Sequence, residues 1–195
     1  MTQVIKAIVG LGNPGPRYSE TRHNAGFWFL ERFARQASGN FRDETKFHGE
    51  VGSVVVAGSK VWLLKPMTYM NCSGQGVRAL CSYYKIAPNE VLVAYDELDL
   101  SPGAARFKWG GGHGGHNGLR DICAHLGSRD FARLRIGIGH PGHKDQVSDY
   151  VLGRPRKDDQ PKIDGAIDEA LRVIETFIQG QSDAATKALH TATKL

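Results

Sequence analysis

The feature that most constrains the fold is an alternation, along the whole chain, of short apolar runs with longer segments of helical periodicity. The runs are β-branched or wholly apolar and end near glycine or proline, which is typical of buried strands. Strands are predicted at residues 4–9, 49–57, 60–64, 91–94, 104–109 and 134–138, and helices between a cap at Thr21 and a stop at Ser38 and over residues 68–84, 115–126, 163–178 and 184–189. Such alternation predicts an α/β fold with a twisted, mostly parallel (mixed) sheet and helices on both faces.

The chain has 195 residues, which is the length of one domain, and it contains no repeat or low-complexity linker. We therefore expect residues 1–195 to form a single domain, with a helical C-terminal segment, about residues 156–193, packed on it. The three cysteines are an odd number without CxxC spacing, and the N-terminus carries no signal-peptide pattern. No apolar stretch is long enough to cross a bilayer. These features predict a cytoplasmic protein with no membrane association.

Polar residues follow two of the predicted strands. Asn13 lies in a proline-stiffened turn after the first strand, His23 and Asn24 open the next helix, and Asp96 follows the strand at residues 91–94. Ligands of open α/β sheets bind beyond the carboxyl ends of strands, so His23 and Asp96 are expected at one sheet edge. A carboxylate on one ring nitrogen makes a histidine a general base at the other. The alternative is that His23 packs against the helix start and Asp96 caps a turn.

Two further asparagines, Asn71 and Asn117, also lie near predicted strand ends. A neutral amide carries both a donor and an acceptor and suits carbonyl and amide groups of a ligand, although asparagine is also common in turns. The histidine pairs at 113/116 and 140/143 come without cysteine or clustered carboxylates, so no metal is predicted. No cofactor is predicted either. The GxGxxG at residues 10–15 lacks the helix start and acidic residue of a dinucleotide site, and the chain has neither a GK[ST] loop nor a GxSxG elbow.

The positive charge is concentrated in one part of the sequence. The chain has 25 Lys and Arg against 20 Asp and Glu, and residues 105–144 alone carry seven basic residues against two aspartates. The rest of the chain is therefore balanced. A basic patch on a balanced surface suits a polyanion such as nucleic acid, and the alternative is a solvated face that maintains solubility.

Five segments in order resemble bacterial peptidyl-tRNA hydrolase, a family whose members hydrolyse the ester between a peptide and the terminal ribose of tRNA and so recycle tRNA in translation. The resemblance runs from about Val4 to Pro155. It rests on residues 12–26 (GNPGPRYSETRHNAG), 65–74 (KPMTYMNCSG), 96–100 (DELDL), 110–119 (GGGHGGHNGL) and 133–141 (RLRIGIGHP). It implies a single α/β domain, a monomer, and peptidyl-tRNA and tRNA as partners.

The resemblance also implies roles for individual residues. His23 would be the general base and Asp96 would hold it in the basic tautomer. Asn13 would help to distinguish a peptidyl ester from a free aminoacyl ester. The other implied substrate residues are Tyr18, Tyr69, Met70, Asn71, His116 and Asn117, and the implied tRNA phosphate residues are Lys108 and Arg135. Two other classes remain open at this point: a non-catalytic RNA-binding module, and a dinucleotide-dependent enzyme.

Overall fold

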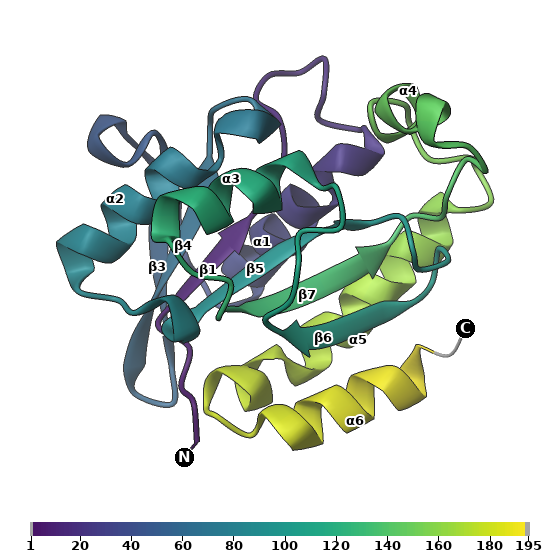
Figure 1. Ribbon diagram of the computed structural model, residues 1–195. Coiled ribbons are helices and arrows are strands. Elements are labelled where there is room, and N and C mark those ends of the chain that lie inside the picture. Colours follow the sequence, from purple (N-terminus) through teal and green to yellow (C-terminus); the bar gives the residue numbers. More distant parts are fainter. Residues whose placement is uncertain (1, 194–195) are drawn as a thin grey trace.

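The computed structural model describes residues 2–193 and contains one seven-stranded sheet (Figure 1). The strands are β1 (Ala7–Gly10), β2 (Arg42–Glu44), β3 (Gly49–Val56), β4 (Ser59–Pro66), β5 (Val91–Glu97), β6 (Ala105–Trp109) and β7 (Ala132–Gly137). Their spatial order is β2-β3-β4-β1-β5-β7-β6. Strand β1 pairs in parallel with β4 and β5, and β5 pairs in parallel with β7, whereas β2/β3, β3/β4 and β6/β7 are antiparallel. The predicted α/β class with a mixed sheet is confirmed.

The parallel centre of the sheet explains the wholly apolar strand sequences. All four residues of β1 are buried, as are the first six of β5. A strand that is covered by helices on both faces has no polar side to alternate with, so it reads as a continuous apolar run. The carboxyl ends of the parallel strands β4, β1 and β5 lie at one edge of the sheet.

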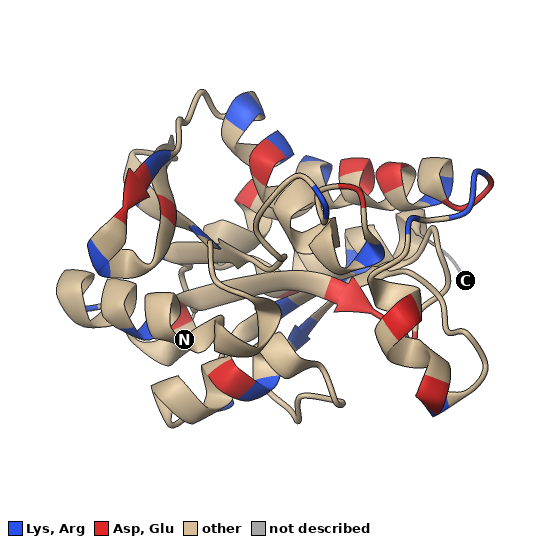
Figure 2. Cartoon of the chain, turned by 90° about the horizontal axis from the view of Figure 1, so that it is seen from above, with Lys and Arg blue, Asp and Glu red and all other residues tan. Residues whose placement is uncertain are grey.

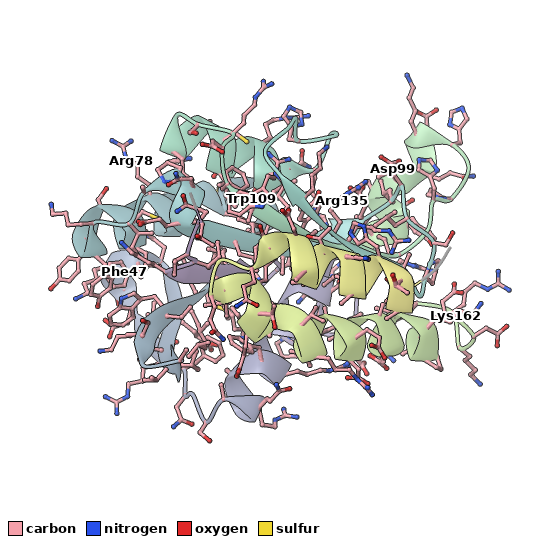
Figure 3. The ribbon with its side chains drawn as sticks, turned by 90° about the horizontal axis from the view of Figure 1, so that it is seen from below. Phe47, Arg78, Asp99, Trp109, Arg135 and Lys162 are labelled. Atoms are coloured by element: carbon pink, nitrogen blue, oxygen red, sulfur yellow. The ribbon has the colours of Figure 1, made fainter. Side chains whose placement is uncertain are left out.

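Helices cover both faces of the sheet. They are α1 (Ala25–Gln36), α2 (Gly74–Tyr84), α3 (Asn117–Leu126), α4 (Val147–Val151), α5 (Gln160–Ile178) and α6 (Ser182–Ala192). Helices α1, α5 and α6 form one apolar cluster with the sheet, and α2 and α3 form the other. Seen from below, α5 and α6 lie side by side, and α6 packs against the edge strand β6 (Figure 3). Within residues 2–193 no helix has the length and apolarity that a membrane crossing needs.

Several predicted boundaries differ from the structure. The helix predicted from residue 68 begins as α2 at Gly74, after a 3₁₀ turn at Met70–Cys72. The two glycines of α2 serve close packing: a Cβ at Gly76 would lie 2.4 Å from the carbonyl oxygen of Phe47. The strand predicted to stop at residue 94 continues to Glu97, so Asp96 lies inside β5. Thr21 does not cap α1, because its hydroxyl donates to the carbonyl oxygen of Tyr18. Strand β2 and helix α4 were not predicted.

Candidate active site

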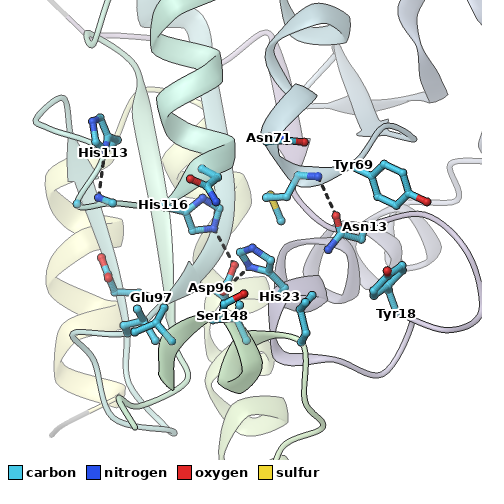
Figure 4. A pocket seen from close by; sticks show the side chains of 18 of the residues that line it. Asn13, Tyr18, His23, Tyr69, Asn71, Asp96, Glu97, His113, His116 and Ser148 are labelled. Atoms are coloured by element: carbon cyan, nitrogen blue, oxygen red, sulfur yellow. Dashed lines mark hydrogen bonds and ion pairs between the residues drawn. The ribbon is translucent and has the colours of Figure 1, made fainter. Parts of the chain in front are cut away.

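A cleft of about 500 Å³ opens at the carboxyl ends of β1, β4 and β5 (Figure 4). The predicted catalytic and substrate residues all line it, and they come from separate segments of the chain. They are Asn13, Tyr18, His23, Tyr69, Met70, Asn71, Asp96, His116 and Asn117. The parallel pairing of the three strands puts their following turns side by side, which is why residues distant in sequence meet here.

Asp96 lies at the floor of the cleft and contacts two histidines. Its Oδ2 is 2.8 Å from Nδ1 of His23, and its Oδ1 is 2.8 Å from Nε2 of His116. All three side chains are largely buried. The predicted contact between His23 and Asp96 is present, whereas the sequence had offered His116 only as a residue that lines the site.

The hydrogen bonds assign a tautomer to each histidine. A carboxylate only accepts hydrogen bonds, so the proton lies on Nδ1 of His23 and on Nε2 of His116. The other nitrogen of His116, Nδ1, accepts from the backbone N–H of Leu119 at 3.4 Å and caps α3. Both nitrogens of His116 are therefore engaged. Nε2 of His23 has no hydrogen-bond partner among residues 2–193 and can accept a proton from a molecule in the cleft.

The electrostatics of the pair keep Asp96 charged. Burial by itself would raise the pKa of Asp96, but the two histidines and their hydrogen bonds hold that pKa well below its usual range. Burial would likewise lower the pKa of His23, and the charge and hydrogen bond of Asp96 outweigh it, so the His23 pKa is raised. The result is a charged carboxylate that stabilises a proton on His23.

His23, Asp96 and His116 are also the group within residues 2–193 whose side chains could hold a metal ion, because one ligand atom from each lies within 4.8 Å of the others. The separations of 2.8 Å match hydrogen bonds, and both carboxylate oxygens are already occupied by ring N–H groups. Nitrogen and oxygen ligands around a zinc ion at about 2.0–2.2 Å spread farther apart than this. The arrangement fits a hydrogen-bonded triad better than a metal centre.

Asn13 is held from two sides. The side chain of Asn24 accepts from the backbone N–H of Asn13 at 2.9 Å and donates to its carbonyl oxygen at 3.0 Å. The backbone N–H of Met70 donates to Oδ1 of Asn13 at 2.7 Å. Because that oxygen is occupied, the free polar group of Asn13 is its Nδ2, a hydrogen-bond donor. Asn24, which the sequence placed beside the site but gave no role, thus orients Asn13.

The remaining substrate residues lie around the mouth of the cleft. Tyr18 and Tyr69 approach edge to face with ring centroids 6.3 Å apart, and the Tyr69 side chain is exposed (Figure 4). Asn71 lies in the 3₁₀ turn after β4, and Asn117 is the first residue of α3. These amides are accessible from the cleft and can bind polar groups of a ligand.

Lys108 and Arg135 lie outside the cleft. Lys108 is exposed on the edge strand β6, two positions from Arg106, which is paired in register with Arg135. The guanidinium of Arg135 is 2.8 Å from a carboxylate oxygen of Glu97, which lines the cleft. Acidic positions also lie at the end of β5 in the view from above (Figure 2). Arg135 is therefore an ion-paired residue rather than a free cation.

Sequence reasoning missed one wall of the cleft, which α4 and its flanking residues form. The lining residues there are Lys144, Val147, Ser148, Val151 and Leu152. The sequence feature that could have indicated this helix is the spacing of Val147 and Val151, four residues apart. Two residues are too short a pattern to predict a helix. Arg22 connects this wall to the 3₁₀ turn that carries His23: its guanidinium stacks on the Tyr150 ring at 3.8 Å and donates to the Tyr150 carbonyl oxygen at 2.8 Å.

Comparisons with known proteins agree on one family. The family described as Peptidyl-tRNA hydrolase matches residues 7–195. Peptidyl-tRNA hydrolases of Ruthia magnifica subsp. Calyptogena magnifica and Marinomonas sp. (strain MWYL1) are each 54% identical over 187 residues, covering 96% and 95% of this chain and 98% and 96% of theirs. A crystal structure of a peptidyl-tRNA hydrolase complex with N-propanol is 51% identical, with a TM-score of 0.95 and coverage of 98% of this chain and 97% of that one. The Acinetobacter baumannii peptidyl-tRNA hydrolase is 52% identical, with a TM-score of 0.93 and coverage of 95% and 94%.

Proposed function

The chain belongs to the peptidyl-tRNA hydrolase family, and we propose that it hydrolyses the ester of peptidyl-tRNA with a water molecule that His23 activates. The family assignment decides against a non-catalytic RNA-binding module and against a dinucleotide-dependent enzyme. The observation that carries the proposed base is the set of contacts around Asp96: both nitrogens of His116 have partners, whereas no residue among 2–193 forms a hydrogen bond with Nε2 of His23.

The reaction follows from these positions. Nε2 of His23 takes a proton from water as the water oxygen attacks the ester carbonyl carbon, and Asp96 stabilises the imidazolium through Nδ1. The carbonyl oxygen gains negative charge in the tetrahedral intermediate, and donors aimed at it lower the barrier. When the intermediate collapses, the bond to the ribose oxygen breaks and His23 returns its proton to that oxygen. The products are a peptide acid and free tRNA.

Asn13 supports selectivity for peptidyl over aminoacyl esters. The backbone N–H of Met70 occupies Oδ1 of Asn13, so Nδ2 of Asn13 is left as a donor toward the cleft. A donor pairs with a carbonyl oxygen of the peptide, whereas a free α-ammonium group would meet a second donor and lose its water without compensation. Asn71 and Asn117 add neutral amides for the peptide and for the attacking water, beside Met70 and His116.

The wider assignments extend the same proposal. Lys108 and Arg135 contact tRNA phosphate, with the charge of Arg135 shared with Glu97, and Tyr18 and Tyr69 contact the tRNA end or the peptide. The enzyme acts as a cytoplasmic monomer, residues 1–195 form one domain, and neither metal nor cofactor takes part. An ester is sufficiently reactive for a base and hydrogen-bond donors to suffice.

The test is hydrolysis of N-acetyl-aminoacyl-tRNA beside the unblocked aminoacyl-tRNA. We expect His23→Ala to lower kcat roughly 10²- to 10⁴-fold, the usual contribution of a general base, while the Kd for uncharged tRNA stays near that of wild type. His125→Ala is the matched control, because His125 lies in the last turn of α3, away from the cleft. Full activity of the His23→Ala enzyme would contradict the assignment of His23 as the general base.

A chelator separates the metal-free mechanism from a metal at the triad. We expect wild-type kcat to be the same with and without the chelator after exhaustive dialysis. A loss of activity that added zinc restores would assign His23, Asp96 and His116 to a metal instead.

A further inference from the structure

Arg133 is a buried cation that the mechanism above does not use. It lies in β7 opposite Lys108 of β6, and it is 1% exposed. Within residues 2–193 its guanidinium hydrogen bonds go to two backbone carbonyl oxygens, those of Gly111 at 2.6 Å and Gly112 at 2.5 Å. The face of the guanidinium lies 4.6 Å from the centre of the Phe131 ring.

A buried charge of this kind depends strongly on its partners. Removing a guanidinium from water is costly unless its N–H groups are satisfied, and Nε of Arg133 has no partner among the described residues. The two glycine carbonyl oxygens therefore offset the cost of removing this cation from water. Conversely, the segment that carries those carbonyls is held to the sheet by two charge-assisted hydrogen bonds.

That segment is the glycine loop, residues 110–116, which joins β6 to α3. Gly110 and Gly111 have φ of 63° and 99°, a left-handed conformation that residues with side chains rarely adopt. The loop is further fixed by the N–H of Gly110, which donates to the carbonyl oxygen of Phe131. The other hydrogen bonds of the loop among residues 2–193 are formed by residues 113–116. They join residues within the loop and the start of α3, or they connect His116 to Asp96 in the cleft.

The glycine loop ends at the catalytic triad. His116 closes the loop, donates to Asp96 at 2.8 Å and caps α3, and Asn117 follows it in the cleft. We propose that Arg133 is a positioning residue for the hydrolysis, holding the glycine loop in the shape that delivers His116 to Asp96 and Asn117 to the cleft. The inference rests on the proposed function of this site and concerns a residue that lines no part of it.

The expected signature is a loss in kcat without a loss in tRNA binding. A displacement of catalytic groups by about 1 Å can cost on the order of 10²-fold in rate, so we expect Arg133→Ala to lower kcat for N-acetyl-aminoacyl-tRNA roughly 10- to 100-fold. The Kd for uncharged tRNA and its salt dependence should stay near those of wild type, because the buried guanidinium does not contact phosphate. Amide hydrogen exchange of the peptide that covers the glycine loop should accelerate.

Chemical rescue distinguishes positioning from a general loss of structure. Guanidinium chloride far below denaturing concentrations should raise the kcat of Arg133→Ala severalfold, whereas sodium chloride at equal ionic strength should not raise it. His23→Ala should show no rescue. If Arg133→Ala does not fold, Arg133→Lys is the test variant. Lysine keeps the charge but cannot donate to both carbonyl oxygens from a planar guanidinium, so we expect a smaller fall in kcat at an unchanged Kd for uncharged tRNA.

Three results would overturn the inference. They are a wild-type kcat in the folded Arg133→Ala or Arg133→Lys enzyme, a defect confined to KM with a weaker salt dependence, and rescue by sodium chloride as effective as rescue by guanidinium. The second result would make Arg133 a tRNA contact. Full activity of the His23→Ala enzyme would contradict the proposed function, and it would do so independently of any result for Arg133.

Discussion

Asp96 controls the protonation of the whole site because each of its oxygens serves a different histidine. His23 Nδ1 donates to one oxygen and His116 Nε2 to the other. The far side of each ring has a different contact, Leu119 N–H for His116 and the cleft for His23, and this difference favours His23 as the proposed base. Sequence patterns predicted His23 and Asp96 as a pair, but they could not assign the tautomers.

At this scale the pH profile tests the pair. His23 must be neutral to accept a proton. Burial lowers its pKa, but the charge and hydrogen bond of Asp96 outweigh burial and raise that pKa, so the acid limb of kcat/KM should lie at higher pH than an ordinary histidine would give. Asp96→Asn removes the charge that stabilises protonated His23, so its pKa falls and the limb moves to lower pH. Because the asparagine can also donate to Nδ1 and favour the wrong tautomer, kcat should fall roughly 10²-fold or more. An acid limb at the wild-type position would contradict the pairing.

Among the elements, α4 is linked to the turn that carries His23 by side-chain contacts rather than by sequence proximity. Arg22 directly precedes His23, and its contacts with Tyr150 span 128 residues of the chain. The Tyr150 hydroxyl in turn donates to the carbonyl oxygen of Ile138 at 2.6 Å. A five-residue helix has little stability of its own, so these contacts hold it in place.

We therefore expect Tyr150→Leu to loosen α4. The loss of the cation–π contact and the hydroxyl bond should lower the free energy of unfolding by about 1–3 kcal/mol. Because Val147 and Val151 line the cleft, the KM for N-acetyl-aminoacyl-tRNA should rise more than kcat falls. Tyr150→Phe keeps the ring and should show only the hydroxyl part, about 1 kcal/mol, in denaturant unfolding. Equal effects of the two variants would assign the whole contribution to the hydroxyl.

Over the whole molecule, the charge excess separates into structural and accessible cations. Of the seven basic residues between 105 and 144, three are buried or half-buried and have internal partners: Arg106 donates to the Thr193 carbonyl oxygen, Arg133 to the glycine loop, and Arg135 to Glu97. The exposed ones are Lys108, Arg120, Arg129 and Lys144. The accessible part of the basic stretch, which is the part that could contact tRNA under the proposed function, is therefore smaller than its count of charges indicates.

The salt dependence of tRNA binding measures this footprint. Each phosphate contact contributes a slope of about 0.7 to 0.9 to log Kd against log salt. Lys108→Gln should reduce the slope by about one such contact, and Arg135→Gln should reduce it less because Glu97 already pairs with Arg135. Lys60→Gln, at the start of β4 and outside the basic stretch, is the control and should leave the slope unchanged. A Lys108→Gln slope equal to that of wild type would remove Lys108 from the interface.

The sequence by itself determined the α/β class, most helices and strands, and the residues that meet at the ends of β1, β4 and β5. The class and the elements follow from local periodicity, and the meeting of His23 with Asp96 follows from the rule that parallel strands end at one edge. The resemblance to a known family supplied the other residues of the cleft, among them Tyr18, Tyr69 and His116. Only the tertiary structure decided that β5 extends through Asp96, that His116 shares this carboxylate, that α4 walls the cleft, and that Arg133 is buried under the glycine loop. The physical reason is distance along the chain: Asp96 meets partners 73 and 20 residues away. Such contacts depend on how the elements pack, and a local sequence pattern does not predict that packing.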